Sequence, residues 1–188
     1  MRIAFFASGS GSSLRAIVAA CAAGELAATP VLLIANRDCK AIDFAKSHDL
    51  PHQVIPTVGA QGEAADTRQL AALKAAGADW VILSGYLRKL GPLVLGAYAG
   101  RILNIHPALL PAWGGAGMYG RKVHEAVLAA GVTETGASVH YVDGEYDHGA
   151  VVAQQRVPVL PGDTVEVIEA RVMAIEPALF VRTLKGLV

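Results

Sequence analysis

Residues 3–13 have the sequence IAFFASGSGSS, in which an apolar run leads directly into a loop of glycine and serine. The apolar run predicts a buried strand, and residues 12–23 have the pattern of a helix that Gly24 ends. A strand that passes through a glycine-rich loop into a helix is the first unit of an α/β fold. We therefore expect a mainly parallel sheet that grows outward from this unit.

The same alternation continues along the chain. Short apolar runs predict further strands, and helical patterns or turn residues separate them. The predicted strands are 30–35, 52–55, 80–84 and 102–105, the predicted helices are 41–48 and 64–75, and a loop is predicted at 58–62. These elements predict a Rossmann-like α/β fold, in which helices flank a mainly parallel sheet.

The last third of the chain has a different pattern. It predicts a loop rich in proline and glycine, a helix, an antiparallel hairpin and a long amphipathic helix, at 107–120, 121–130, 137–142 with 151–157, and 164–184. Asp163 is the expected cap of the final helix. No repeat or linker interrupts the 188 residues, so a single domain is expected.

Composition argues against several classes of protein. Hydrophobic residues make up 53% and charged residues 17%, which suits a packed core. Acidic and basic residues number 16 each, a balance that does not favour nucleic acid or an anionic membrane as partner. No apolar run approaches the ~20 residues of a membrane span. Cys21 and Cys39 lack metal-ligand spacing, so a reduced, cytoplasmic protein without a metal is expected.

The glycine–serine loop is a candidate phosphate site. Gly9 and Gly11 allow a ligand close to the backbone, and the N–H groups that open a helix attract anions. Ser12 and Ser13 add hydroxyl donors there. Leu14 stands where the dinucleotide-binding fingerprint has its third glycine, and no P-loop lysine follows. The alternative interpretation is a tight turn with a serine cap.

The segment Asn104-Ile105-His106-Pro107 is a candidate catalytic site. Residues two apart in an extended segment point to the same side, so Asn104 and His106 are expected to face one cleft. They follow a predicted parallel strand, and α/β proteins place their sites at the carboxyl ends of such strands. An amide that holds an oxyanion beside an imidazole that moves a proton suits attack on a carbonyl. The alternative is a strand end whose polar groups cap neighbouring loops.

Three acidic residues, Asp143, Glu145 and Asp147, form a second candidate. They are expected in a solvated turn unless one of them reaches His106, where it would orient the imidazole and favour its protonated form. His148 is a weaker candidate proton carrier, because no oxyanion donor stands next to it.

The remaining polar residues are less informative. Residues 86–90 form either a solvated basic turn or a backbone edge that binds a planar ligand. From spacing alone, Glu176 belongs to a solvated face of the last helix, and His124 and His140 are structural.

Taken together, these segments resemble a known family. The loop at 8–14, the segment NIHPALLP at 104–111 and residues 138–147 are similar to the phosphoribosylglycinamide formyltransferases, the folate-dependent glycinamide ribonucleotide transformylases of purine synthesis. The Asn-Ile-His-Pro segment with the distal aspartate is specific for the wider formyltransferase superfamily. The glycine–serine loop narrows the resemblance to this family, and the resemblance covers essentially the whole chain.

The resemblance implies transfer of a formyl group from 10-formyltetrahydrofolate, as co-substrate, to the amine of glycinamide ribonucleotide. It implies these two small molecules as partners, no metal, and a monomer or a homodimer. The N-terminal half, about 1–100, would bind phosphate, and the half at about 101–188 would bind folate and catalyse. The implied roles are catalysis for Asn104, His106 and Asp147, contact with the ribonucleotide for Gly11, Ser12, Ser13 and Glu176, and contact with folate for Leu87, Arg88, Lys89, Leu90, Asn104, Val142 and Asp143.

The sequence departs from this family at three positions. Ser13 stands where asparagine is common, and His148 stands where glycine is common. No arginine near Glu63 matches the residue that commonly meets the glutamate tail of folate.

Two other functions stay open. A formyltetrahydrofolate hydrolase, or a formyltransferase that acts on tRNA or a sugar nucleotide, would share the catalytic trio, but the additional domains of the hydrolases and tRNA enzymes are not expected here. The other is a nucleotide-binding redox module built on the glycine loop. Leu14 argues against it, as do Asn36 and Arg37 where the second strand would end in an acidic residue.

Overall fold

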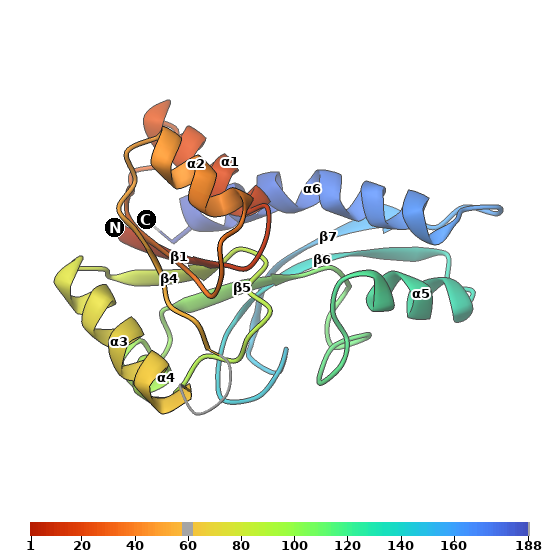
Figure 1. Cartoon of the computed structure of the whole chain (residues 1–188). Helices are drawn as coiled ribbons and strands as arrows, with labels where there is room; N and C mark the ends of the chain where they lie inside the picture. Colours follow the sequence, from red (N-terminus) through yellow and green to blue (C-terminus); the bar gives the residue numbers. More distant parts are fainter. Residues whose placement is uncertain (58–61, 188) are drawn as a thin grey trace.

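The computed structural model describes residues 1–57 and 62–187, and a seven-stranded sheet runs through its centre (Figure 1). The strand order is β3-β2-β1-β4-β5-β6-β7. The parallel strands are β1 (Arg2–Ala7), β2 (Thr29–Ala35), β3 (His52–Val54), β4 (Trp80–Leu83) and β5 (Ile102–His106). An antiparallel hairpin of β6 (Glu134–Tyr141) and β7 (Val151–Pro158) extends the sheet beyond β5. The predicted mainly parallel sheet with a C-terminal hairpin is confirmed.

Helices cover both faces of the sheet (Figure 1). One face packs against α1 (Ser12–Ala22), α2 (Lys40–Ser47) and α6 (Val165–Lys185), and the other against α3 (Gly62–Ala75) and α4 (Pro92–Ala97). The helix α5 (Arg121–Ala129) contacts α6. Within β1, Ile3 and Phe5 join one core while Ala4 and Phe6 join the other. This two-sided burial explains why the central strands are continuous apolar runs rather than alternating ones.

Three details differ from the sequence-based expectation. The short helix α4 was not predicted, although Pro92 occupies its first turn, where proline is favoured. Thr164, not Asp163, caps α6 and accepts a hydrogen bond from the Val167 N–H, while Asp163 pairs with Arg171. The predicted loop at 58–62 lies outside the described residues except for its last position, which begins α3.

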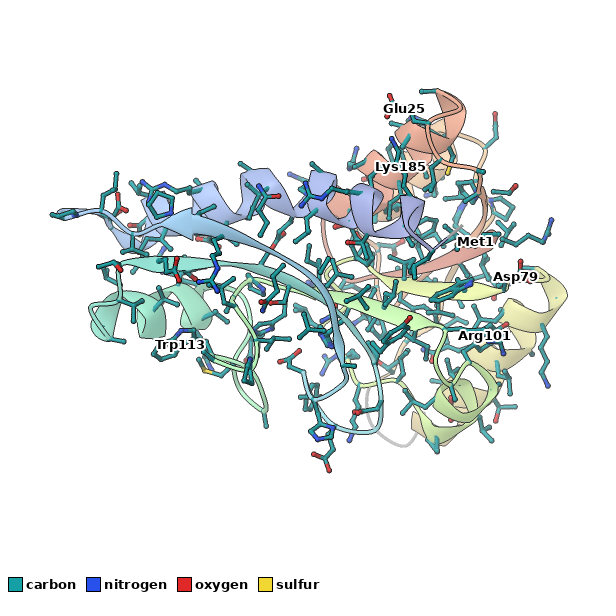
Figure 2. The ribbon with its side chains drawn as sticks, turned by 180° about the vertical axis from the view of Figure 1, so that it is seen from behind. Met1, Glu25, Asp79, Arg101, Trp113 and Lys185 are labelled. Carbon is teal, nitrogen blue, oxygen red and sulfur yellow. The ribbon has the colours of Figure 1, made fainter. Side chains whose placement is uncertain are left out.

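The final helix α6 lies along the sheet and ends against α1. Glu25, just after α1, and Lys185, in the last turn of α6, lie beside one another (Figure 2), with 3.1 Å between Oε2 and Nζ. Leu179 and Phe180 on α6 are fully buried in the core. Within the described part of the chain, α6 and the other helices lack the combination of length and apolar character that a membrane span requires.

Asp66 of α3 holds the start of α4 and therefore the end of the segment at 86–90. Its carboxylate accepts hydrogen bonds from the N–H groups of Leu93 at 2.7 Å and Val94 at 3.1 Å, and the side chain is 4% exposed. Gly91 makes room for it, because a Cβ there would lie 2.2 Å from Asp66 Cγ. Asp66 thus supplies from another helix the cap that α4 lacks in its own sequence.

Replacing Asp66 with alanine is expected to lower the free energy of unfolding by about 1–2 kcal/mol, because two helix-start N–H groups lose their acceptor. Urea unfolding measures the change. Asp43→Ala, at an exposed position of α2, is the matched control and should change stability by less than about 0.5 kcal/mol. Equal losses in the two variants would contradict the capping role.

Candidate active site

One cleft of about 410 Å³ brings together nearly all the candidate residues. It opens where the chain leaves the carboxyl ends of β1, β4 and β5, and α6 and the loop between β6 and β7 close its sides. The candidates that line it are Ser12, Ser13, Leu87, Arg88, Lys89, Leu90, Asn104, His106, Val142, Asp143, Asp147 and Glu176. Gly11 does not reach the lining, although its two neighbours do.

A second hollow, of about 500 Å³, is less suited to chemistry. It is lined by Leu109, Ala112, Trp113 and residues 131–135. Glu134 is the charged residue of this lining, and its carboxylate pairs with Arg156. The lining contains no histidine, so we assign the chemistry to the cleft at the strand ends.

The loop between β1 and α1 is fixed by its neighbours. Gly11 has φ +65°, in the left-handed region, and a Cβ there would lie 3.0 Å from Ala41 Cβ. The Ser8 hydroxyl donates to Asn36 Oδ1 at 2.7 Å and accepts the N–H of Leu87 at 3.0 Å. These bonds connect the candidate phosphate loop to the segment at 86–90, and Ser12 of this loop lines the cleft.

Asn104, His106 and Asp147 meet in the middle of the cleft. His106 Nδ1 lies 3.4 Å from Asp147 Oδ2, and His106 Nε2 donates a hydrogen bond of 2.7 Å to the Trp113 carbonyl. The Gly115 N–H donates to Asp147 Oδ2 at 3.1 Å. Figure 2 shows Trp113 on the loop below α5. The same loop therefore holds both the imidazole and the carboxylate, through a carbonyl and an N–H group.

Sequence reasoning missed His140, which lies directly opposite Asn104 on the neighbouring strand. His140 Nδ1 donates to the Tyr141 carbonyl at 2.8 Å, while its Nε2 lies 3.1 Å from Asn104 Nδ2 and 3.5 Å from Asp147 Oδ1. The side chain is 2% exposed. The hairpin was predicted, but its register against β5 was not, and only that register places His140 beside Asn104.

Burial and neighbouring charges shift the pKa values of His106 and Asp147 in opposite directions. Burial lowers the pKa of His106, and Asp147 and the Trp113 carbonyl raise it by less, so it stays below the ordinary imidazole range. Burial raises the pKa of Asp147, but His140, His106 and the Gly115 N–H outweigh this and keep it below its usual value. Asp147 is therefore the fixed charge of the site, and His106 is the group whose charge can change.

Glu176 does not lie on a solvated face as its spacing suggested. It lines the cleft, and burial raises its pKa to about 7. No hydrogen-bond partner for it is found within residues 1–57 and 62–187. His124, interpreted as structural, also lines the cleft, and burial lowers its pKa. A carboxylate without a protein partner is suited to bind hydroxyl groups of a ligand.

His148 does not act beside the trio. Its side chain is 68% exposed, and its Nδ1 lies 2.9 Å from Asp143 Oδ2. The hydrogen bond that the His148 ring donates to the Asp143 carboxylate raises the pKa of His148. Nearby, Lys89 lies over the ring of Tyr146, 5.7 Å from its centroid, so two loops that line the cleft touch one another.

Comparisons with known proteins agree with this geometry. Residues 1–184 match the family model described as formyl transferase. The chain is 41% identical over 185 residues to the chloroplastic phosphoribosylglycinamide formyltransferase of Arabidopsis thaliana, covering 96% of this chain and 63% of that protein. It is 36% identical to the phosphoribosylglycinamide formyltransferase of Escherichia coli strain K12, covering 96% and 84%. The chain spans 60–63% of the length of the two plant relatives, which is less than two thirds. The crystal structure of glycinamide ribonucleotide transformylase 1 from Geobacillus kaustophilus superposes with a TM-score of 0.91 at 40% identity, covering 99% and 97%.

The raised pKa of Glu176 predicts how stability depends on pH. A carboxyl whose pKa is higher in the folded state holds its proton more tightly there, so it favours folding at low pH. This contribution is lost as pH rises from about 4.5 to about 7. Glu176→Gln removes it and should make the protein more stable than wild type at pH 8, by about 1–3 kcal/mol. Thermal unfolding of both proteins at pH 5 and pH 8 measures the difference, and an equal difference at both pH values would contradict the burial of this carboxyl.

Proposed function

The chain belongs to the formyl transferase family, and we propose that it transfers the formyl group of 10-formyltetrahydrofolate to the amine of glycinamide ribonucleotide. The observation that carries this proposal is the arrangement of Asn104, His106 and Asp147 midway along a cleft with two different ends. One end offers helix-start hydroxyls and the Glu176 carboxylate, which has no hydrogen-bond partner among the described residues. The other end offers apolar side chains and backbone edges.

The ribonucleotide fits the end formed by α1 and α6. Ser12 and Ser13 open α1, where N–H groups and the helix dipole favour a phosphate. Glu176 faces the same space and would accept hydrogen bonds from the ribose hydroxyls. Gly11 contributes through its backbone conformation, which turns the chain into α1, rather than through direct contact.

The folate fits the other end. Leu87, Leu90 and Val142 supply apolar walls, and the loops that carry them expose backbone groups that can pair with a planar heterocycle. Arg88 and Lys89 are exposed cations at this end and suit the negative glutamate tail of folate. Arg88 and Lys89 would therefore bind the glutamate tail, a contact for which the sequence has no matching arginine near Glu63.

The reaction would take place where the two ends meet. The amine attacks the formyl carbon, and the formyl oxygen gains negative charge in the tetrahedral intermediate. An N–H of Asn104 and the protonated imidazole of His106 would stabilise that charge. Burial lowers the pKa of His106, but the developing negative charge on the formyl oxygen raises it and so favours the protonated imidazole. His106 would then release the Trp113 carbonyl, give its Nε2 proton to the departing folate nitrogen and take up the proton that the attacking amine loses, while Asp147 keeps the imidazole oriented.

Spectroscopic measurement of tetrahydrofolate release, with and without glycinamide ribonucleotide, tests this proposal. We expect release only when the ribonucleotide is present. Release at the same rate without it would instead show a hydrolase, and no release under either condition would contradict formyl chemistry. Tight binding of NAD without binding of folate would favour the redox module.

His106→Ala should lower turnover by about 10²–10³-fold, because the positive charge beside the oxyanion and the proton carrier are lost together. Binding of the ribonucleotide, measured by titration calorimetry, should stay close to wild type since the phosphate end of the cleft is unchanged. His48→Ala, at an exposed position after α2, is the control. Turnover of the His106 variant near that of the control would rule out the assigned role.

A further inference from the structure

Two imidazoles face the single carboxylate of Asp147. His106 Nδ1 lies 3.4 Å from Oδ2, and His140 Nε2 lies 3.5 Å from Oδ1. Two adjacent imidazolium ions would repel one another, so Asp147 readily stabilises a second ring proton on one imidazole at a time. Formyl transfer as proposed above needs that second proton on His106, because the positive charge of this imidazole is to stabilise the oxyanion that forms beside it.

The surroundings of His106 suit the doubly protonated ring. Its Nε2 must carry hydrogen, because it lies 2.7 Å from the Trp113 carbonyl, which can only accept. Its Nδ1 faces the Asp147 carboxylate, which also only accepts. Both nitrogens of His106 therefore face acceptors, and a neutral ring would place a lone pair against a carboxylate.

The surroundings of His140 suit the singly protonated ring. Its Nδ1 must carry hydrogen, because it lies 2.8 Å from the Tyr141 carbonyl. Its Nε2 lies nearer to the Asn104 amide nitrogen, at 3.1 Å, than to Asp147. An N–H of Asn104 donates to Nε2 when His140 is neutral. If Nε2 gained a proton, its N–H and the N–H of Asn104 would face one another, unless the Asn104 amide flipped to present its oxygen.

We propose that the Asn104–His140 hydrogen bond keeps His140 neutral, so that the proton stabilised by Asp147 resides on His106, and that His140 in return fixes the orientation of the Asn104 amide. One N–H of Asn104 is held by His140, and the second N–H is left for the formyl oxygen. His140 is thus a positioning residue, which acts through Asn104. This role rests on the proposed function, but the placement of the proton does not.

The other charged groups near the pair do not alter this assignment. His140 is also near Asp143, which lies in the loop that carries Asp147. The Asp143 carboxylate pairs with His148 on the surface. His106 is near His124 of α5, an imidazole whose charge would oppose protonation of His106. Among the described residues, Asp147 is the only carboxylate with an oxygen within 4 Å of a ring nitrogen of His106 or His140.

NMR of the ring nitrogens in the protein without substrates tests the placement of the proton. As pH is lowered, His106 should gain its second proton while His140 keeps a single proton on Nδ1. In Asn104→Ala, His140 Nε2 loses its donor, and His140 should then take up a second proton at a higher pH than in wild type. A wild-type protein in which His140 is the first of the two to become doubly protonated would overturn the proposal. So would an unchanged His140 in Asn104→Ala.

Substitution of His140 tests its effect on the amide. His140→Gln places an oxygen that can accept from Asn104 near the former Nε2 and should keep turnover within about threefold of wild type. His140→Leu offers no acceptor, so a loosened oxyanion donor should lower turnover by about 10–100-fold with the KM of each substrate nearly unchanged. Equal turnover in the two variants would overturn the positioning role. The NMR result needs neither substrate, so its failure is distinguishable from failure of the proposed function.

Discussion

The active-site geometry depends on one carboxylate that three segments share. Asp147 accepts the N–H of Gly115 and faces both His106 and His140, with 10% of its side chain exposed. Its backbone has φ +53°, a left-handed conformation that costs roughly 1–2 kcal/mol for a residue other than glycine. Aspartate tolerates this conformation better than most residues, and the conformation accompanies a side chain that points into the cleft. Because Asp147 is largely buried, its charge is weakly screened, and it raises the pKa of His106 against the burial that lowers it.

The sheet explains how distant segments reach that carboxylate. The strand order runs from β1 through β2 to β3 on one side and through β4 to β5 on the other, so the chain reverses direction across the sheet at β1. Loops that leave β1 and β4 on either side of such a point form a crevice. The antiparallel pairing of β6 with β5 then sets His140 opposite Asn104, and the following loop folds back to bring Asp147 to His106. The parallel strands thus form the crevice, and the loop of the antiparallel hairpin places the Asp147 carboxylate in it.

The sequence predicted those parts of the molecule that depend on local pattern. The apolar runs located the strands because parallel strands are buried on both faces, and residues two apart placed Asn104 and His106 on one side. Local pattern did not predict what depends on contacts between distant segments. The helix α4 is capped by Asp66 from α3, so its own six residues carry little signal beyond Pro92. His140 required the register of β6 against β5, and the burial of Glu176 required the packing of α6 beside the cleft.

The account's central claim is that both substrates meet beside Asn104 and His106. A crystal structure with glycinamide ribonucleotide and an unreactive folate analogue bound together tests it most directly. We predict the phosphate at Ser12 and Ser13, and the amine within about 3.5 Å of the carbon that replaces the formyl group, next to Asn104 and His106. A folate analogue bound instead in the hollow lined by Trp113 and residues 131–135, or a phosphate bound away from the start of α1, would contradict it.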